Sequence, residues 1–193
     1  MKSNILVLIG HPYPKSFCSA LAAAYREGAS VTGANIKIID LSAISFDPNL
    51  KNGYHKRTDL EPELMEAQDM VSWADHLVLI YPNWWGTMPA VFKGFFDRVF
   101  LPGFAFKMKE NSSQWEKLLK GKTARLIVTS DTPSWLNRLI YRRAGLQTMR
   151  KNILMFCGIN PVRITEINPV TKSTPEQREK WLQRVKQLGE KQA

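Results

Sequence analysis

Short, uninterrupted apolar runs alternate along the chain with longer segments in which apolar residues recur every three or four positions. Runs of Ile, Leu and Val without intervening polar residues are typical of strands that are buried on both faces of a sheet. We therefore predict five strands, over residues 4–9, 34–41, 76–81, 123–130 and 161–167.

The segments between these runs have the spacing of amphipathic helices. Pro62 and Pro89 mark the first turns of two of them, and Thr174 begins a "TPEQ" stretch that is typical of a capping box. The predicted helices cover residues 16–29, 61–74, 89–100, a region near 144–155, and a last segment that starts at Thr174.

This order of strands and helices predicts an α/β fold, namely a flavodoxin-like, doubly wound, five-stranded parallel sheet with helices on both faces. With 193 residues, we expect a single domain over residues 1–193. In such folds the ligand binds outside the carboxyl ends of the strands. Candidate site residues therefore come from the loops after the first, third and fourth strands.

The loop after the first strand reads "GHPYPKSF" and contains neither GxxxxGK[ST] nor GxGxxG. It leads into a helix whose first amide groups and dipole favour an anion. The Ser16 hydroxyl and the His11 imidazole can add donors to a phosphate. The alternative is that Ser16 only caps the helix and that His11 is an ordinary loop residue.

The loop after the third strand reads "YPNWWGTMP". Trp84 and Trp85 provide a large aromatic area at the expected ligand edge, and the turn at Gly86 presents backbone N–H groups. This combination indicates a flat heteroaromatic cofactor. The alternative is that the two tryptophans pack under a neighbouring loop or in a dimer contact.

The formal net charge is +10, and most of the excess lies in residues 107–151, which contain eleven Lys or Arg and three Asp or Glu. Such a segment attracts an anionic surface, a phosphorylated ligand or nucleic acid. Its cations are not interleaved with aromatic residues that stack on bases, so we expect no nucleic-acid binding. A solvated basic surface is the simpler alternative.

Cys18 and Cys157 are too few for a disulfide framework, and the three histidines lack the spacing of zinc motifs. We therefore expect no metal site and a cytoplasmic location, and we interpret Cys157 as a core residue. No apolar run approaches the ~20 residues that span a bilayer. Membrane association is accordingly expected only through a partner.

Two stretches, "GHPYPKSFCSAL" and "ADHLVLIYPNWWGTMPAVFKGFFDRVFLPGFAF", resemble the signature regions of the flavodoxin-like NAD(P)H:quinone oxidoreductase family, also called the flavodoxin-2 group. "KLLKGKTARLIVTSDTPSW" and "FCGINPVRI" resemble later segments of the same family. The resemblance covers essentially the whole chain. It implies an enzyme in which a bound flavin, FAD or FMN, passes hydride from NAD(P)H to a quinone or similar acceptor.

The resemblance also implies roles for individual residues. In the family, the first loop holds the flavin phosphates and the third loop lies along the isoalloxazine ring. A glutamine seven positions before the "AD" aspartate contacts the dinucleotide part of FAD in some members, and Gln68 has this spacing, which slightly favours FAD. The cofactor-binding residues implied in this way are His11, Ser16, Phe17, Cys18, Gln68, Pro82, Asn83, Trp84, Trp85, Gly86, Thr129, Ser130, Asp131 and Thr132.

Two regions depart from the family pattern. Cys18 stands where asparagine is usual, so we expect only its backbone to bind. After the fourth strand, "TSDTPSW" replaces the Thr-Thr-Gly-Gly turn of mammalian-type members, which also have a tyrosine and a histidine implicated in hydride transfer. Here Tyr141 follows without a histidine. Tyr141 is the catalytic candidate that remains, and we assign no proton donor.

The resemblance further implies how substrates and partners bind. Because they lie just beyond the loop after the fourth strand, Arg138, Arg142 and Arg143 are our candidates to contact the anionic nicotinamide nucleotide. Family members are usually homodimers, and the aromatic helix 89–100 is apolar around more of its circumference than one core stripe needs. The alternative is that this helix is simply buried in a monomer.

A second function stays open beside the enzyme. Some relatives in the resembled family are ancillary, regulatory subunits of membrane potassium efflux systems. An electron-carrying flavodoxin fits less well, because that family has an acidic charge and a threonine-rich phosphate loop.

Overall fold

The computed structural model describes residues 2–53, 55–56, 58–110 and 112–192. Its main sheet has five parallel strands in the spatial order β2-β1-β3-β6-β7. The direction of winding reverses between β1 and β3, as in a doubly wound fold, and the predicted fold class is confirmed. The strands are β1 (Asn4–Ile9), β2 (Asn35–Asp40), β3 (His76–Pro82), β6 (Thr123–Thr129) and β7 (Val162–Ile167).

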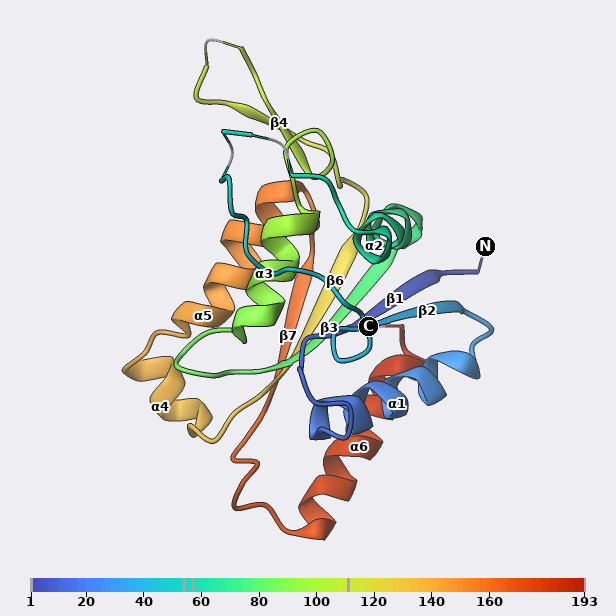
Figure 1. Cartoon of the computed structure of the whole chain (residues 1–193). Coiled ribbons are helices and arrows are strands. Elements are labelled where there is room, and N and C mark those ends of the chain that lie inside the picture. The colour runs from blue at the N-terminus through green and yellow to red at the C-terminus, as the bar shows by residue number, and fades with distance from the viewer. Residues whose placement is uncertain (1, 54, 57, 111, 193) are drawn as a thin grey trace.

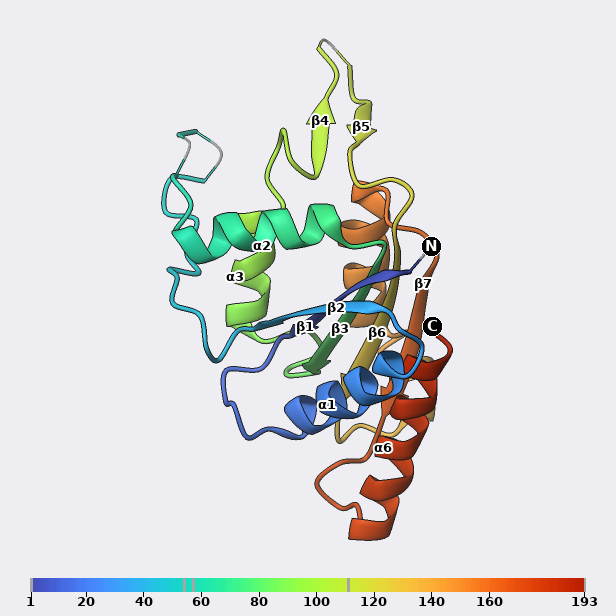
Figure 2. The ribbon, with the colours of Figure 1, turned by 90° about the vertical axis from the view of Figure 1, so that its right-hand side faces the viewer.

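Helices cover both faces of this sheet (Figures 1 and 2). One face is covered by α1 (Phe17–Ser30) and α6 (Pro175–Glu190), which pack side by side. The other face is covered by α2 (Pro62–Trp73), α3 (Ala90–Val99), α5 (Ala144–Gln147) and a π-helix, η1 (Thr148–Met155). Ser16 caps α1, and Thr174 caps α6 with the predicted capping box.

The alternation of side chains along the strands divides the core into two halves. In β1, Val7 packs with α1 and α6, whereas Leu6 and Leu8 pack with α2 and α3. All seven residues of β3 are buried, because a central parallel strand is covered on both faces. The sheet is thus a rigid base for the loops at its carboxyl edge.

The aromatic residues of α3 belong to this core. Phe92 and Phe95 are completely buried, Phe96 is 3% exposed, and Phe100, directly after the helix, is 7% exposed. The alternative in which this helix is simply buried is therefore confirmed. The helix leaves no aromatic surface for a second copy, and the homodimer stays a prediction without this support.

The sequence pattern does not predict three short elements. β4 (Phe106–Met108) and β5 (Trp115–Lys117) form an antiparallel hairpin that extends away from the main sheet (Figure 2). α4 (Ser134–Leu139) follows β6. A strand of three residues and a helix of six are too short to show the periodicity of their type. Among the described residues, no helix combines the length and apolar character that crossing a membrane requires.

Candidate functional site

The loops that follow β1, β3, β6 and β7 meet at the carboxyl edge of the sheet, and a pocket of about 190 Å³ lies between them. This is the end of the sheet at which α4 lies in Figure 1. The structure therefore brings together residues from all three loops that the sequence indicated. The pocket is lined by His11, Phe17, Cys18, Pro82, Asn83, Trp84, Thr129, Ser130, Asp131, Val170 and Thr171.

His11 is held in one orientation by its own loop. Its Nδ1 accepts a hydrogen bond from the backbone N–H of Tyr13 at 2.9 Å, which leaves the proton of the neutral ring on Nε2. Partial burial lowers the pKa of His11, so the imidazole is neutral near pH 7. The ring also meets Trp84 edge-on, with centroids 5.4 Å apart. No described residue accepts from the Nε2–H of His11, which is therefore a donor for a ligand.

The amino end of α1 contributes backbone donors. The Oγ of Ser16 accepts a hydrogen bond from the N–H of Ser19 at 3.2 Å, so Ser16 does cap the helix. The first two helical residues, Phe17 and Cys18, line the pocket, and within the described chain their backbone N–H groups have no hydrogen-bond partner. Free amides at a helix amino end favour an anion.

The Cys18 thiol links the first loop to the end of β6. Its Sγ lies 3.6 Å from the Oγ1 of Thr129, and burial raises the pKa of Cys18 to about 11. Burial likewise raises the pKa of Cys157 to about 12. Both thiols stay protonated at neutral pH, so neither is an activated nucleophile. Cys157 is buried, as its interpretation as a core residue requires.

The third loop turns back on itself just beyond β3. The N–H of Trp84 donates to the carbonyl of Thr87 at 2.8 Å, and the N–H of Thr87 donates to the carbonyl of Trp84 at 3.0 Å. Trp85 and Gly86 form the two-residue turn between them. Trp84 is 43% exposed, whereas the side chain of Trp85 is completely exposed. For Trp85, the alternative of packing under a neighbouring loop is therefore wrong.

A carboxylate ties the loop after β6 to the loop after β7. Asp131 accepts hydrogen bonds from the backbone N–H of Thr171 at 2.6 Å and from its Oγ1 at 2.7 Å. These bonds lower the pKa of Asp131. The contact places Val170 and Thr171 at the pocket, and the sequence reasoning missed both. Their position after a parallel strand was the signal that could have identified them.

Some expected residues do not line this pocket. Tyr141 is 57% exposed and lies beyond α4, outside the set of lining residues. Four others are neighbours of lining residues in the chain without lining the pocket themselves, namely Ser16, Trp85, Gly86 and Thr132.

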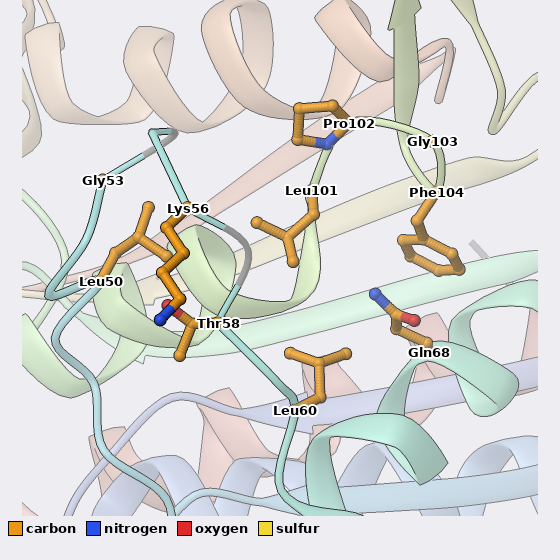
Figure 3. Close-up of a pocket in the computed structure, with 10 residues that line it drawn as sticks. All are labelled: Leu50, Gly53, Lys56, Thr58, Leu60, Gln68, Leu101, Pro102, Gly103 and Phe104. Carbon is orange, nitrogen blue, oxygen red and sulfur yellow. The ribbon is translucent and has the colours of Figure 1, made fainter.

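Gln68 lies in a different pocket, of about 460 Å³, which α2 forms with the chain before it and the residues after α3 (Figure 3). Its Nε2 donates to the backbone carbonyl of Val99 at 2.9 Å. Since α2 holds Gln68 away from the loops at the carboxyl edge, its amide does not join the other expected cofactor residues of the same chain. The structure thus separates Gln68 from the other expected cofactor residues, and its contact with the dinucleotide part of FAD stays a prediction.

The three candidate arginines are in different environments. The Nη2 of Arg143 pairs with the Oε1 of Glu166 at 2.6 Å, and the Nδ2 of Asn137 donates to the Oε2 of the same carboxylate at 2.9 Å. Arg143 is therefore bound within the fold. Arg138 and Arg142 are exposed, and of the three candidates these two form no salt bridge with a described residue.

Comparisons with known proteins agree with this architecture. A family model described as a flavodoxin-like fold, Flavodoxin_2, matches residues 3–189. The crystal structure of Smu.1420 from Streptococcus mutans is 37% identical, with a TM-score of 0.86 over 97% of this chain and 99% of that chain. A structure of NAD(P)H:quinone oxidoreductase from Methanothermobacter marburgensis has a TM-score of 0.82 at 24% identity and covers 100% of both chains, which shows a shared fold.

Curated relatives give the same result. An uncharacterized NAD(P)H oxidoreductase of Haemophilus influenzae is 29% identical over 82% of this chain and 80% of its own length. The ribosyldihydronicotinamide dehydrogenase [quinone] of Mus musculus is 25% identical over 96% of this chain and 91% of its own length. The chain therefore belongs to the flavodoxin-like fold family Flavodoxin_2, in which it is similar to NAD(P)H oxidoreductases and quinone-dependent dehydrogenases.

Proposed function

We propose that this chain is a flavin-dependent oxidoreductase that takes hydride from NAD(P)H and passes it to a quinone or similar acceptor. The observation that carries the proposal is the pocket at the carboxyl edge, where a helix amino end, an aromatic turn and several hydroxyl groups converge. The family match and the names of the relatives point to the same chemistry.

The α1 side of the pocket is suited to the flavin phosphate. The free amides of Phe17 and Cys18 and the Nε2–H of His11 are donors at a helix amino end, where the dipole adds a favourable field. Each hydrogen bond to a charged phosphate contributes ~1.5 to 3 kcal/mol net. Ser16 acts indirectly, because its hydroxyl holds the first turn of α1 in place.

The β3 and β6 sides are suited to the isoalloxazine ring. Pro82, Asn83 and Trp84 line one wall, and Thr129 and Ser130 line the other. A volume of about 190 Å³ is below the ~300 Å³ at which small-molecule sites usually begin. The pocket therefore holds part of a flavin, and the remainder lies along the open edge.

Trp85 gives this open edge a flat apolar surface. Its completely exposed ring follows Trp84 in the turn, where a nicotinamide and an acceptor can stack in succession. The bound flavin supplies the hydride chemistry, and the chain positions donor and acceptor beside it. Because one open face serves both substrates, ping-pong kinetics are expected. Arg138 and Arg142 are the proposed contacts for the nucleotide phosphates.

The regulatory alternative has less support. The relatives from Haemophilus influenzae and Mus musculus are named as oxidoreductase and dehydrogenase, and the pocket has the elements that an enzyme of this kind needs. We retain the homodimer as a proposal, with a contact surface other than the buried aromatic face of α3.

Flavin binding is tested by titrating the purified chain with FMN and with FAD and following the quenching of flavin fluorescence. We expect saturable binding at micromolar concentration or below, which corresponds to at least ~8 kcal/mol. The flavin with the lower Kd is the resident cofactor. If neither flavin binds in this range, the proposed function is wrong.

A further inference from the structure

Arg125 is a buried cation that forms no salt bridge with any residue that the structure describes. It lies on β6, in the middle of the sheet, and is only 7% exposed. Its Nη1 donates to the neutral hydroxyl of Thr165 at 2.7 Å, and its Nε has no partner. Taking a guanidinium out of water is costly unless an opposite charge accompanies it.

Arg98, the other arginine among the buried residues, shows how this fold stabilises a buried guanidinium group. Arg98 is 2% exposed, and its Nη2 pairs with the Oε2 of Glu61 at 2.7 Å. Its guanidinium also donates to the backbone carbonyls of Asp47 and Asp59. Arg98 thus has a carboxylate and two carbonyl oxygens, where Arg125 has a single hydroxyl.

Further cations, rather than anions, surround Arg125. Arg163 is its register partner on β7, so both side chains leave the sheet on the same face. Val78, the register partner of Arg125 on β3, packs in the core half under α1 and α6, which identifies that face. Arg184 lies on α6, between Trp181 and Val185, which pack in this same core half. Burial lowers the pKa of Arg125, Tyr25 raises it, and the charges of Arg163 and Arg184 lower it further.

Within the described part of the chain, none of these three arginines forms a salt bridge, and Arg163 and Arg184 are exposed. Two other buried polar atoms on the same face also lack partners, the hydroxyl of Tyr25 and the Nε2 of His76. On this face the guanidinium donors outnumber the hydroxyl oxygens that can accept from them, and such an excess of charged donors is the complement of an oxyanion.

We propose that Arg125, Arg163 and Arg184 form a binding site for a phosphate-class oxyanion, either inorganic phosphate or the phosphate group of a small ester, beneath α6. Arginine matches the oxygens of such an anion with paired N–H groups, and a doubly charged anion balances more of the excess charge than chloride does. The site is separate from the pocket at the carboxyl edge of the sheet. Arg125 precedes Thr129, the last residue of β6, by four positions, which is ~13 Å along a strand.

The test is isothermal titration calorimetry of the full chain at pH 7.5 and constant ionic strength, with inorganic phosphate in one arm and glycerol phosphate in the other. We expect saturable binding in at least one arm, and the tighter arm identifies the source of the phosphate. The double variant Arg163→Gln/Arg184→Gln should raise the Kd at least ~10-fold, because two charge-assisted contacts are lost. The matched control, Lys107→Gln/Lys151→Gln, removes two exposed charges on β4 and η1 and should leave the Kd unchanged.

A second variant tests the buried cation itself. Arg125→Met should unfold at the same temperature in phosphate and in chloride, whereas the unmodified chain should unfold at a higher temperature in phosphate. The proposal is overturned if neither anion shows saturable binding, if the control variant weakens binding as much as the double variant, or if Arg125→Met keeps the phosphate-dependent shift. The last two outcomes indicate an adventitious ion only. Flavin binding is expected to be unchanged in all three variants.

Discussion

Trp85 and Gly86 occupy the two central positions of a type I′ turn, with φ angles of 52° and 79°. Both positions require positive φ, which is why Asn-Gly is the preferred pair. A bulky residue in this conformation costs on the order of 1–3 kcal/mol. The side chain of Trp85 recovers none of this by packing, since it is completely exposed. We attribute its presence to a ligand rather than to the fold.

Trp85→Asn separates these two roles. We expect the variant to be more stable by ~1 kcal/mol, because asparagine tolerates positive φ, and to have a lower kcat/KM for NAD(P)H because the stacking surface is lost. Urea unfolding and steady-state kinetics measure the two effects. Gly86→Ala is the comparison, and it should be less stable because φ is 79° at that position. An unchanged kcat/KM in the Trp85→Asn variant would remove Trp85 from the site.

A substitution at Ser16 can keep the helix cap and still add a negative charge at the proposed phosphate site. Ser16→Ala should lose ~1 kcal/mol of stability, because the bond to the N–H of Ser19 is lost. Ser16→Asp keeps the cap, so its stability should stay within ~0.5 kcal/mol. Its added negative charge should nevertheless weaken flavin binding at least ~10-fold. Equal flavin affinity in Ser16→Asp and the unmodified chain would place the phosphate elsewhere.

Gly145 lies close against the backbone of the turn formed by Trp85 and Gly86. A Cβ at this position would lie 2.0 Å from the carbonyl oxygen of Gly86, so Gly145→Ala must displace the turn. We expect weaker flavin binding and slower turnover together with reduced stability. Gly189→Ala is the matched control, because its Cβ would lie 2.2 Å from the carbonyl of Tyr25 in the α1–α6 contact. If both variants lose stability and flavin affinity alike, the effect of Gly145 is not local.

The exposed and the bound arginines should respond differently to substitution. Arg138→Ala/Arg142→Ala should raise the KM for NADPH with little change in stability, since both side chains are exposed. Arg143→Ala should instead lower stability, because it leaves the largely buried carboxylate of Glu166 without its cation. Steady-state kinetics and thermal unfolding distinguish these cases. An unchanged KM for NADPH in the double variant would exclude both exposed arginines.

The lowered pKa of His76 leads to a prediction of how the free energy of unfolding depends on pH in chloride buffer. Burial, followed by the charges of Arg125 and Arg163, lowers the pKa of His76 to about 4, whereas an unfolded chain has a histidine pKa of ~6.5. Between these values the unfolded chain binds a proton that the native chain does not. The contribution of His76 should therefore lower stability by up to ~3 kcal/mol as the pH drops from ~6.5 to ~4, and His76 itself adds no further loss below.

His76→Asn provides the control for this dependence. Asparagine keeps a polar group beside the Oγ1 of Thr123, which lies 2.6 Å from the Nδ1 of His76, but it does not titrate. The variant should lack this part of the pH dependence in urea unfolding. Identical slopes for both chains between about pH 4 and pH 6.5 would show that another group is responsible.

The sheet and its main helices were predictable because their signals are local. Continuous apolar runs indicate the strands, and Ser16 and Thr174 mark helix starts by capping chemistry that acts within four residues. The contact between Asp131 and Thr171 was not predictable, because it joins positions 40 residues apart. The pattern around α3 did not distinguish a buried helix from a dimer surface, since both need apolar residues around the helix.

The candidate site likewise has features that the sequence predicted and features that it did not. The loops were indicated by topology alone, and the structure brings His11, Trp84 and Thr129 together as expected. The family resemblance named Gln68 among the cofactor residues, whereas the structure places it in another pocket, beside α3. The unpaired charge of Arg125 is a property of its three-dimensional surroundings, and one strand residue in a sequence gives no sign of it.

The most direct test of the proposed function is the absorbance spectrum of the flavin-reconstituted chain under anaerobic conditions, recorded before and after NADPH and then after menadione. We predict a band near ~450 nm that bleaches with NADPH and returns with the quinone. A chain that takes up no flavin, or whose flavin band neither NADPH nor NADH bleaches, would contradict the proposed function.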